Sequence, residues 1–488
     1  MFDPKVKLKT LKIENRFFID GKFLTTQNTI LKTSSINNYK LPNLYVCLED
    51  EVNLAVSTAY QAYQNGIWKK KSLEEKKQIL YKLADLIEKS KDDLSLIDTI
   101  ETGRSIKNFY FDSIPKAVEG IRWFSEAVDK YFDHAITPTN NQLTSIVKQP
   151  LGVVGIITPW NDPLVVNFWK ITPALLMGNS VVVKPAEQAS FSMLKIASLA
   201  KEAGIPDGVL NIITGDGRTG KLLALHNDIR GIFFTGSSEV GKLILQYSGQ
   251  SNMKKVGLEC GGKSPFVVTK NSNNLQKAAK ILAKNIFYNQ GQICSAPSRL
   301  IIDKEIKDIF LNYLIDESQN YIPSDPLDFD TNVGKVINQA QKERIESYIN
   351  YANQESIKTI IISDNKDSMS FSPTIFDEVS PNSKLAQDEI FGPTLVVIVY
   401  ESLDEAISIA NNTKYGLAAA VFSDDINEAN KLALAIEAGL VHINTYDAET
   451  YQMPFGGVKE SGLGRDKSIL VFDEYSELKT IITQLDFE

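Results

Sequence analysis

The sequence predicts an α/β protein with two domains and mostly parallel strands. Its 488 residues exceed what a single hydrophobic core usually holds, so two or three domains are expected. Segments with helical periodicity, such as Leu80–Glu88, alternate with short apolar β-branched runs, such as Val153–Ile157. This alternation is typical of helices that cover a parallel sheet.

Two series of such segments follow each other along the chain. The first continues with strand-like runs at Ser180–Lys184 and Asn211–Ile213. The second follows Glu259 and contains the helical Leu275–Tyr288 and the strand-like Ser298–Ile302, Leu395–Val399 and Ala419–Phe422. The sequence therefore predicts two α/β domains that are joined near residues 259–262.

Three further segments have a clear local character. Leu143–Lys148 and Leu478–Gln484 are rich enough in β-branched residues to be strands. Ser363–Ser370, with its Asn, Asp and Ser residues, is typical of a solvated loop. The chain shows no internal repeat and no low-complexity tract.

Composition excludes several classes of partner. With 43% hydrophobic and 23% charged residues the chain is an ordinary globular protein, and its net charge of -8 offers no basic surface for nucleic acid or anionic membranes. The N-terminal residues Met1–Lys9 contain no apolar signal region, and no run is long enough to span a membrane. We expect a cytoplasmic protein whose partners are small molecules and copies of itself.

The three cysteines differ in their surroundings. Cys47 lies in an apolar run and Cys260 follows a strand-like segment, so both are expected to be small buried side chains. Cys294 lies in a polar, Gly-rich segment, which suits a nucleophile as well as a structural residue. The histidines show no metal-ligand spacing with these cysteines, so no metal site is expected.

The flanks of Cys294 and six other segments carry a family resemblance. In chain order they are Thr158-Pro-Trp-Asn161, Lys184-Pro-Ala-Glu187, Phe234-Thr-Gly-Ser237, Leu258-Glu-Cys-Gly-Gly-Lys263, Gly291-Gln-Ile-Cys294, Glu389-Ile-Phe-Gly-Pro393 and Pro454-Phe-Gly-Gly457. Together they make the chain resemble the aldehyde dehydrogenase superfamily over almost its whole length.

Four other segments resemble one group within that superfamily. They are Gly249–Lys255, Phe287–Gln292, Arg465–Ser468 and Glu477–Thr480, and they are similar to the γ-glutamyl-γ-aminobutyraldehyde dehydrogenases and the related aminoaldehyde and betaine aldehyde enzymes. They are not expected to contact substrate, so they indicate kinship more than specificity.

The resemblance implies a division of the chain into two Rossmann-like domains and an arm. Residues 1–127 and 151–261 would form an NAD-binding domain, and residues 262–460 a catalytic domain. Residues 128–150 and 475–488 would form a β-strand arm that packs against a neighbouring subunit in a homodimer or homotetramer.

The resemblance also implies a catalytic set of three residues. Cys294 would attack an aldehyde, Glu259 would act as the general base, and the Asn161 amide with the Cys294 N–H would stabilise the oxyanion. Each residue type also has a structural interpretation. Glu259 could be a salt-bridged carboxylate at a strand end, and Asn161 could be a turn or cap residue after Pro159.

For the cofactor, the resemblance implies contacts from Lys184, Glu187, Gly236, Ser237, Glu389 and Phe391. The pyrophosphate would lie at a helix N-terminus at Gly236-Ser237, while a carboxylate at Glu187 favours NAD without excluding NADP. Gly215–Gly220 also matches a dinucleotide-binding pattern, but it lacks an acidic partner at the usual distance. Gly236–Lys242 imitates a phosphate loop, but Leu243 stands where a hydroxyl would bind magnesium.

The substrate is harder to predict. Asp162 stands where the family usually has an aromatic residue, and with Asp447 and Glu449 it could form an acidic funnel for an amine, with Trp169 as an apolar wall. Alternatively, Asp162 before Pro163 is typical of a helix N-cap.

We expect an NAD(P)-dependent aldehyde dehydrogenase acting on an aminoaldehyde. The alternatives are betaine aldehyde or simple aliphatic aldehydes as substrates, transfer of the acyl group to coenzyme A, and a non-catalytic descendant.

Overall fold

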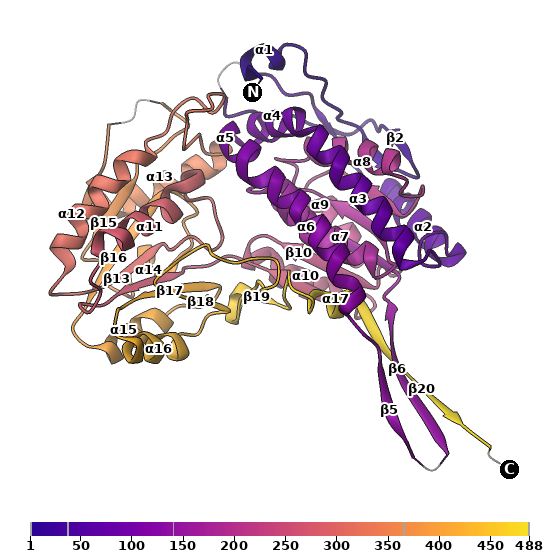
Figure 1. Cartoon of the computed structure of the whole chain (residues 1–488). Helices are drawn as coiled ribbons and strands as arrows, with labels where there is room; N and C mark the ends of the chain where they lie inside the picture. The colour runs from indigo at the N-terminus through magenta and orange to yellow at the C-terminus, as the bar shows by residue number, and fades with distance from the viewer. Residues whose placement is uncertain (1, 37–38, 140, 365–366, 487–488) are drawn as a thin grey trace.

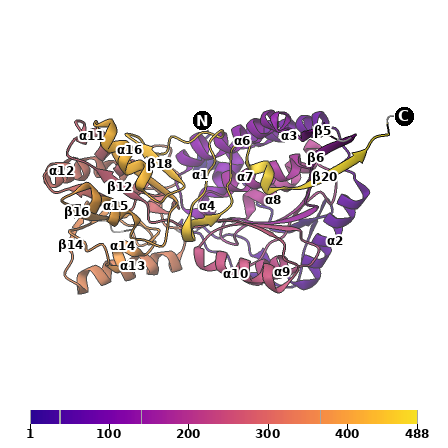
Figure 2. The same cartoon turned by 90° about the horizontal axis from the view of Figure 1, so that it is seen from below.

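Two sheets covered by helices lie side by side, and a β-strand arm projects from one of them (Figures 1 and 2). This computed structural model describes residues 2–36, 39–139, 141–364 and 367–486. Among these residues, no helix has the length and apolar character needed to cross a membrane. The predicted α/β class is confirmed.

The first sheet has eight strands, and its central five, β7 to β11, are parallel. In spatial order they are β19 (Gly462–Leu463), β11 (Lys255–Glu259), β10 (Gly231–Thr235), β7 (Val153–Ile157), β8 (Ser180–Lys184), β9 (Leu210–Ile212), β1 (Phe17–Ile19) and β2 (Lys22–Leu24). Every residue of β7 and β8 is buried, which explains why these strands are continuous apolar runs in the sequence.

Helices pack around this sheet and together with it form the first lobe. They are α2 (Glu49–Asn65), α3 (Leu73–Lys89), α4 (Lys91–Thr102), α5 (Ile106–Asn108), α6 (Ile114–Ala127), α7 (Pro163–Leu176), α8 (Phe191–Ala203), α9 (Gly217–Leu225) and α10 (Ser238–Gln250). Helix α3 illustrates why they form: Ser72 caps its first turn in a capping box with Glu75, and Leu80, Leu83 and Ile87 lie on one buried face. The short α1 (Pro4–Leu8) and α17 (Val471–Glu474) lie at the two ends of the chain.

The second sheet has seven strands, and only its edge strand β14 is antiparallel. In spatial order they are β14 (Lys358–Ile361), β15 (Thr374–Asp377), β16 (Thr394–Tyr400), β13 (Arg299–Asp303), β12 (Pro265–Val268), β17 (Ala418–Phe422) and β18 (Leu440–Ile443). Its helices are α11 (Leu275–Phe287), α12 (Lys307–Ser318), α13 (Gln339–Gln354), α14 (Lys384–Gln387), α15 (Leu403–Asn411) and α16 (Ile426–Ala435). The chain passes from β11 of the first sheet to β12 of the second within residues 260–264.

The arm is a three-stranded antiparallel sheet. Its order is β20 (Ser476–Gln484), β6 (Gln142–Pro150) and β5 (His134–Thr139), and it extends away from both lobes in Figure 1. A two-stranded ribbon, β3 (Thr29–Ile30) with β4 (Leu44–Tyr45), completes the strands of the described residues. The arm leaves Leu478, Ile481 and Ile482 exposed, at 67%, 42% and 63% of their surface.

The predicted elements are found with small shifts at their ends. The strands expected at Leu143–Lys148 and Leu478–Gln484 lie within β6 and β20. The predicted helix Leu275–Tyr288 ends one residue earlier, because Tyr288 has extended backbone angles. In the predicted loop 363–370, residues 365 and 366 lie outside the described residues, and the rest has no helix or strand.

Candidate active site

A large cavity of about 1430 Å³ is lined by residues from both lobes. On the side of the first sheet it meets the carboxyl ends of β10 and β11 and the start of α7, and on the other side the segments before β13 and β16. Carboxyl ends of parallel strands are where α/β proteins usually bind ligands. Cys294, Glu259 and Asn161 all line this cavity.

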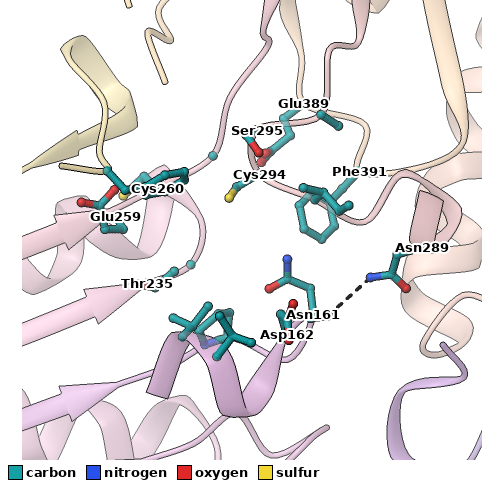
Figure 3. A pocket seen from close by; sticks show the side chains of 18 of the residues that line it. Asn161, Asp162, Thr235, Glu259, Cys260, Asn289, Cys294, Ser295, Glu389 and Phe391 are labelled. Atoms are coloured by element: carbon teal, nitrogen blue, oxygen red, sulfur yellow. Dashed lines mark hydrogen bonds between the residues drawn. The ribbon is translucent and has the colours of Figure 1, made fainter. Parts of the chain in front are cut away.

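The thiol of Cys294 points into the cavity (Figure 3). The turn that presents it is unusual, because Asn289, Gln290 and Gly291 have left-handed φ values of 50°, 56° and 67°. At Gly291 a side chain would meet the carbonyl oxygen of Gly392 at 2.0 Å, so only glycine permits this close approach. Burial, with the nearby carboxylates, raises the pKa of the Cys294 thiol to about 12. The thiol therefore needs a base to become nucleophilic near neutral pH.

Glu259 ends strand β11 and is 5% exposed. Its Oε2 atom is buried without a hydrogen-bond partner, and no ion pair joins it to another described residue. Burial, followed by the charge of Asp466, raises the pKa of Glu259 well above its ordinary value. At Gly456 a side chain would come within 2.6 Å of Glu259 Oε1, so this glycine leaves room for the carboxylate. The salt-bridge alternative thus lacks a partner in the described chain.

Asn161 and Asp162 are held by a buried arginine from another part of the chain. Asn161 Nδ2 donates to the Gln292 carbonyl at 3.0 Å, and its side chain points into the same space as the Cys294 sulfur in Figure 3. Arg104, which is 2% exposed, donates to the Asn161 carbonyl at 3.4 Å and pairs with Asp162 at 3.1 Å. These contacts of Arg104 therefore fix the backbone before α7, which positions the side-chain amide of Asn161.

The structure gives Asp162 a role that neither sequence-based alternative contained. It does stand at the N-cap position of α7, but its side chain makes no capping hydrogen bond. The carboxylate instead pairs with Arg104 and accepts from Ser113 Oγ at 3.3 Å. A charge that is already paired with a buried guanidinium attracts a substrate cation only weakly.

The other residues of the expected funnel also line the cavity. Trp169 packs against Phe455 with ring centroids 5.2 Å apart. Glu449 lies 3.1 Å from His442 Nε2, and this contact lowers the pKa of the Glu449 carboxyl against the opposing effect of burial. Asp447 is exposed to the cavity. Of the three acidic residues, only Asp447 is thus without a close cationic partner in the described chain.

Two charged residues near Glu259 were not predicted from the sequence. Lys170 of α7 and Asp466 form an ion pair of 2.7 Å, with 2% and 6% of their side chains exposed. The signal available in the sequence was a single lysine within the apolar run of α7. Nothing in the sequence pointed to its partner, which lies 296 residues away.

Several of the predicted cofactor residues line the same cavity. Gly236 and Ser237 precede α10, and Ser237 Oγ caps the helix by accepting from Val240 N at 3.3 Å. The first N–H groups of this helix have no intrahelical partner, and the positive end of the helix dipole lies there. Both features favour the binding of an anion. Such a helix start suits a pyrophosphate.

Glu389 and Phe391 lie across the cavity from α10. Glu389 accepts from Gly262 N at 3.0 Å, and burial raises the pKa of its carboxyl to about 7. Phe391 has a left-handed φ of 61° and meets Trp160 edge-on, with ring centroids 5.3 Å apart. Both side chains appear on the same side as Cys294 in Figure 3.

Lys184 and Glu187 lie outside the residues that line this cavity. Lys184 ends β8 and pairs with Glu187 at 3.2 Å. Since β8 adjoins β7, which adjoins β10, the two residues and Ser237 share one sheet edge. In the segment Gly215–Gly220, which matched a dinucleotide-binding pattern in the sequence, Asp216 caps α9 and pairs with Arg218 at 3.0 Å.

Similarity to known proteins indicates the family of this chain. The model of the aldehyde dehydrogenase family matches residues 24–481. The NADP/NAD-dependent aldehyde dehydrogenase PuuC of Escherichia coli (strain K12) is 41% identical over 486 residues, which are 98% of this chain and 98% of that protein.

Two solved structures superpose over nearly the whole chain. The γ-glutamyl-γ-aminobutyraldehyde dehydrogenase of Burkholderia cenocepacia is 40% identical, with a TM-score of 0.96 and 99% of each chain covered. The indole-3-acetaldehyde dehydrogenase AldA of P. syringae, in complex with NAD+ and IAA, is 39% identical, with a TM-score of 0.97 and 99% of each chain covered. The chain therefore belongs to the aldehyde dehydrogenase family.

Proposed function

We propose that this protein oxidises an aminoaldehyde to the carboxylic acid through a covalent adduct on Cys294. The thiolate adds to the aldehyde carbon and forms a thiohemiacetal. Loss of hydride from that carbon leaves a thioester, and acceptance of this hydride is the chemistry that a bound nicotinamide supplies. Water then releases the acid and regenerates the thiol.

The observation that carries the proposal is the shared cavity of a thiol, a carboxyl and an amide. Cys294 needs a proton acceptor because burial raises the pKa of its thiol to about 12. Glu259 has a raised pKa and an unpartnered oxygen, so it can take that proton and later one from the hydrolytic water. Asn161 Nδ2 and the Cys294 N–H would donate to the oxyanion.

We assign the cofactor as NAD, with NADP as an alternative. Gly236 and Ser237 would hold the pyrophosphate, Glu389 and Phe391 the nicotinamide end, and the Lys184–Glu187 pair the adenosine ribose. A carboxylate at Glu187 disfavours the 2′-phosphate of NADP by like charge. The relative named NADP/NAD-dependent and the neighbour solved with NAD+ support this choice.

We propose γ-glutamyl-γ-aminobutyraldehyde as the best candidate substrate. A solved neighbour at 40% identity carries that name, and a Pseudomonas aeruginosa relative at 38% identity is named aminoacetaldehyde dehydrogenase. Betaine aldehyde and simple aliphatic aldehydes are the alternatives. We also propose three parts of the chain: an NAD-binding domain of residues 1–127 and 151–261, a catalytic domain of residues 262–460, and an arm of residues 128–150 and 475–488. The arm would join subunits in a homodimer or homotetramer.

The test is NADH or NADPH formation by purified protein with four aldehydes, namely γ-glutamyl-γ-aminobutyraldehyde, γ-aminobutyraldehyde, betaine aldehyde and propanal. We expect the highest kcat/KM with the first and no turnover by the Cys294→Ala variant. Cys47→Ala is the matched control, because Cys47 is a fully buried thiol of the core. Absence of turnover with every aldehyde and both cofactors would favour a non-catalytic descendant. Turnover that depends on coenzyme A would contradict hydrolysis of the thioester.

A further inference from the structure

The ammonium of Lys467 lies among three aromatic rings at the wall of the cavity. Its Nζ atom is 5.1 Å from the ring centre of Trp169, 5.6 Å from that of Phe455 and 5.8 Å from that of Tyr451. All four residues line the cavity that contains Cys294. We refer to Trp169, Tyr451 and Phe455 as the aromatic cage.

The backbone fixes Lys467 beside this cage. Asp466 exchanges two backbone hydrogen bonds with Phe455, at 2.7 and 2.8 Å, and Ser468 N donates to the Tyr451 carbonyl at 2.8 Å. Lys467 itself has a left-handed φ of 62°. The residues on both sides of Lys467 are therefore bonded to two of the three cage residues, which fixes the backbone that carries this side chain beside the cage.

The rings are also held in place. Tyr451 donates its hydroxyl hydrogen to the Lys116 carbonyl at 2.6 Å, and Trp169 Nε1 donates to the Tyr451 hydroxyl at 3.4 Å. Trp123 stacks on Tyr451 with ring centroids 6.2 Å apart. The aromatic cage is thus a preformed cation site, and a side chain of the protein fills it.

Lys467 is only 6% exposed, yet its Nζ makes no hydrogen bond or ion pair with any residue that the structure describes. The nearby carboxylates of Asp466 and Glu449 are paired with Lys170 and His442 instead. Burial lowers the pKa of the Lys467 ammonium against the opposing charges of Glu449, Asp447 and Asp466. Its hydrogen-bond donors remain available to a molecule in the cavity.

We propose that Lys467 determines substrate specificity by occupying the aromatic cage with its own ammonium, which excludes aldehydes with a cationic head and favours those with a carbonyl or carboxylate oxygen there. An aromatic cage of this kind otherwise recognises quaternary ammonium groups. Here a second cation would find the cage occupied, and the Lys467 ammonium would repel it strongly because the surroundings have a low dielectric constant. An amide or carboxylate oxygen would gain a charge-assisted hydrogen bond.

This inference rests on the proposed function and narrows it. γ-Glutamyl-γ-aminobutyraldehyde carries an amide carbonyl and, beside its α-ammonium, an α-carboxylate, so it has acceptors for Lys467. Betaine aldehyde has only a quaternary ammonium. Among the proposed substrates, Lys467 therefore favours the γ-glutamyl compound over betaine aldehyde.

The experiment compares betaine aldehyde with 3,3-dimethylbutanal, which has the same shape but carbon in place of the charged nitrogen. For the wild type we expect kcat/KM to favour the neutral aldehyde by about 10-fold or more. In Lys467→Met the ratio should fall by about 10-fold, while kcat/KM for γ-glutamyl-γ-aminobutyraldehyde decreases. Lys467→Gln is the second variant, should Met prove insoluble.

Lys284→Met is the matched control, since Lys284 also lines the cavity but is exposed and lies outside the cage. It removes the same charge, so its ratio of the two aldehydes should change much less. An unchanged ratio in both Lys467 variants, with good turnover of the neutral aldehyde, would overturn the inference. Equal changes in the Lys284 and Lys467 variants would do the same, because they would show a general charge effect.

A binding measurement separates this inference from the proposed function. In calorimetric titration with tetramethylammonium chloride, wild-type protein should bind poorly and Lys467→Met should bind more tightly, because the cage is then open. This result does not depend on turnover. A failure of all aldehydes to react would count against the proposed function alone, while equal tetramethylammonium affinities of the two proteins would count against the role of Lys467.

Discussion

Lys170 Nζ lies 2.7 Å from Asp466 Oδ2 in a buried ion pair, and the two charges have opposite effects on the pKa of Glu259. The Asp466 charge raises the pKa of Glu259, whereas the Lys170 charge lowers it. Asp466→Asn should therefore move the acidic limb of the profile of kcat/KM against pH to lower pH, and Lys170→Met should move it to higher pH. Pre-steady-state and steady-state rates across pH would check this.

The same pair predicts a pattern of stability. Each single variant leaves an uncompensated buried charge, so each should lower the free energy of unfolding by about 3–5 kcal/mol. The double variant, Lys170→Met with Asp466→Asn, should lose less than the sum of the two. Urea unfolding of the four proteins forms the double-mutant cycle, and simple additivity would show that the pair contributes nothing as a pair.

The pH dependence of activity should reflect Glu259. A general base works only when deprotonated, and burial raises the pKa of the Glu259 carboxyl. Activity should therefore fall as pH decreases through a pKa that lies well above that of an ordinary glutamate. Glu259→Gln should lose about 10²–10⁴-fold in kcat/KM and also lose this limb. An acidic limb that persists unchanged in Glu259→Gln would assign the titration to another group.

Asp162→Asn should affect stability more than selectivity. The carboxylate pairs with the buried Arg104, so its removal leaves that guanidinium with weaker partners. We expect a loss of about 1–3 kcal/mol in the free energy of unfolding. The ratio of kcat/KM for γ-aminobutyraldehyde to that for propanal should stay near the wild-type value. A selective rise of KM for the amine would instead support the acidic funnel.

Glu187→Gln should relax the preference for NAD. Removing the carboxylate removes its repulsion of the 2′-phosphate, so kcat/KM for NADP relative to NAD should increase by about 10-fold. Glu202→Gln serves as the control, because Glu202 is an exposed carboxylate at the opposite end of α8. A relative increase of equal size in the control would point to overall charge and not to the ribose contact.

The arm should govern assembly. Leu478 and Ile482 are exposed on β20 at 67% and 63%, which is unusual for side chains of that size unless a partner covers them. Leu478→Asp with Ile482→Asp should lower the mass measured in solution by light scattering to that of a smaller species. Lys479→Asp, on the same strand, is the control. A wild-type mass of 54.3 kDa would show that the arm does not join subunits under those conditions.

Local sequence determined most of the secondary structure. The strands at Val153–Ile157 and Ser180–Lys184 were predicted at their observed bounds, because a buried parallel strand is a continuous apolar run that neighbouring residues alone reveal. The motifs around Cys294, Glu259 and Asn161 likewise indicated the family, and these three residues do line one cavity. Their catalytic roles remain proposals.

Tertiary structure decided the electrostatics of the site. Asp162 was expected to be either a cap or an attractor for amines, and only the fold places the buried Arg104 against it. The Lys170–Asp466 pair and the position of Lys467 among three rings also join segments that are far apart in sequence. Charge, burial and pKa depend on distances through space between such segments, whereas periodicity and motifs report only on neighbours along the chain. The sequence by itself therefore determined the elements and the family, and the packing of distant segments against one another determined which charges are free to act.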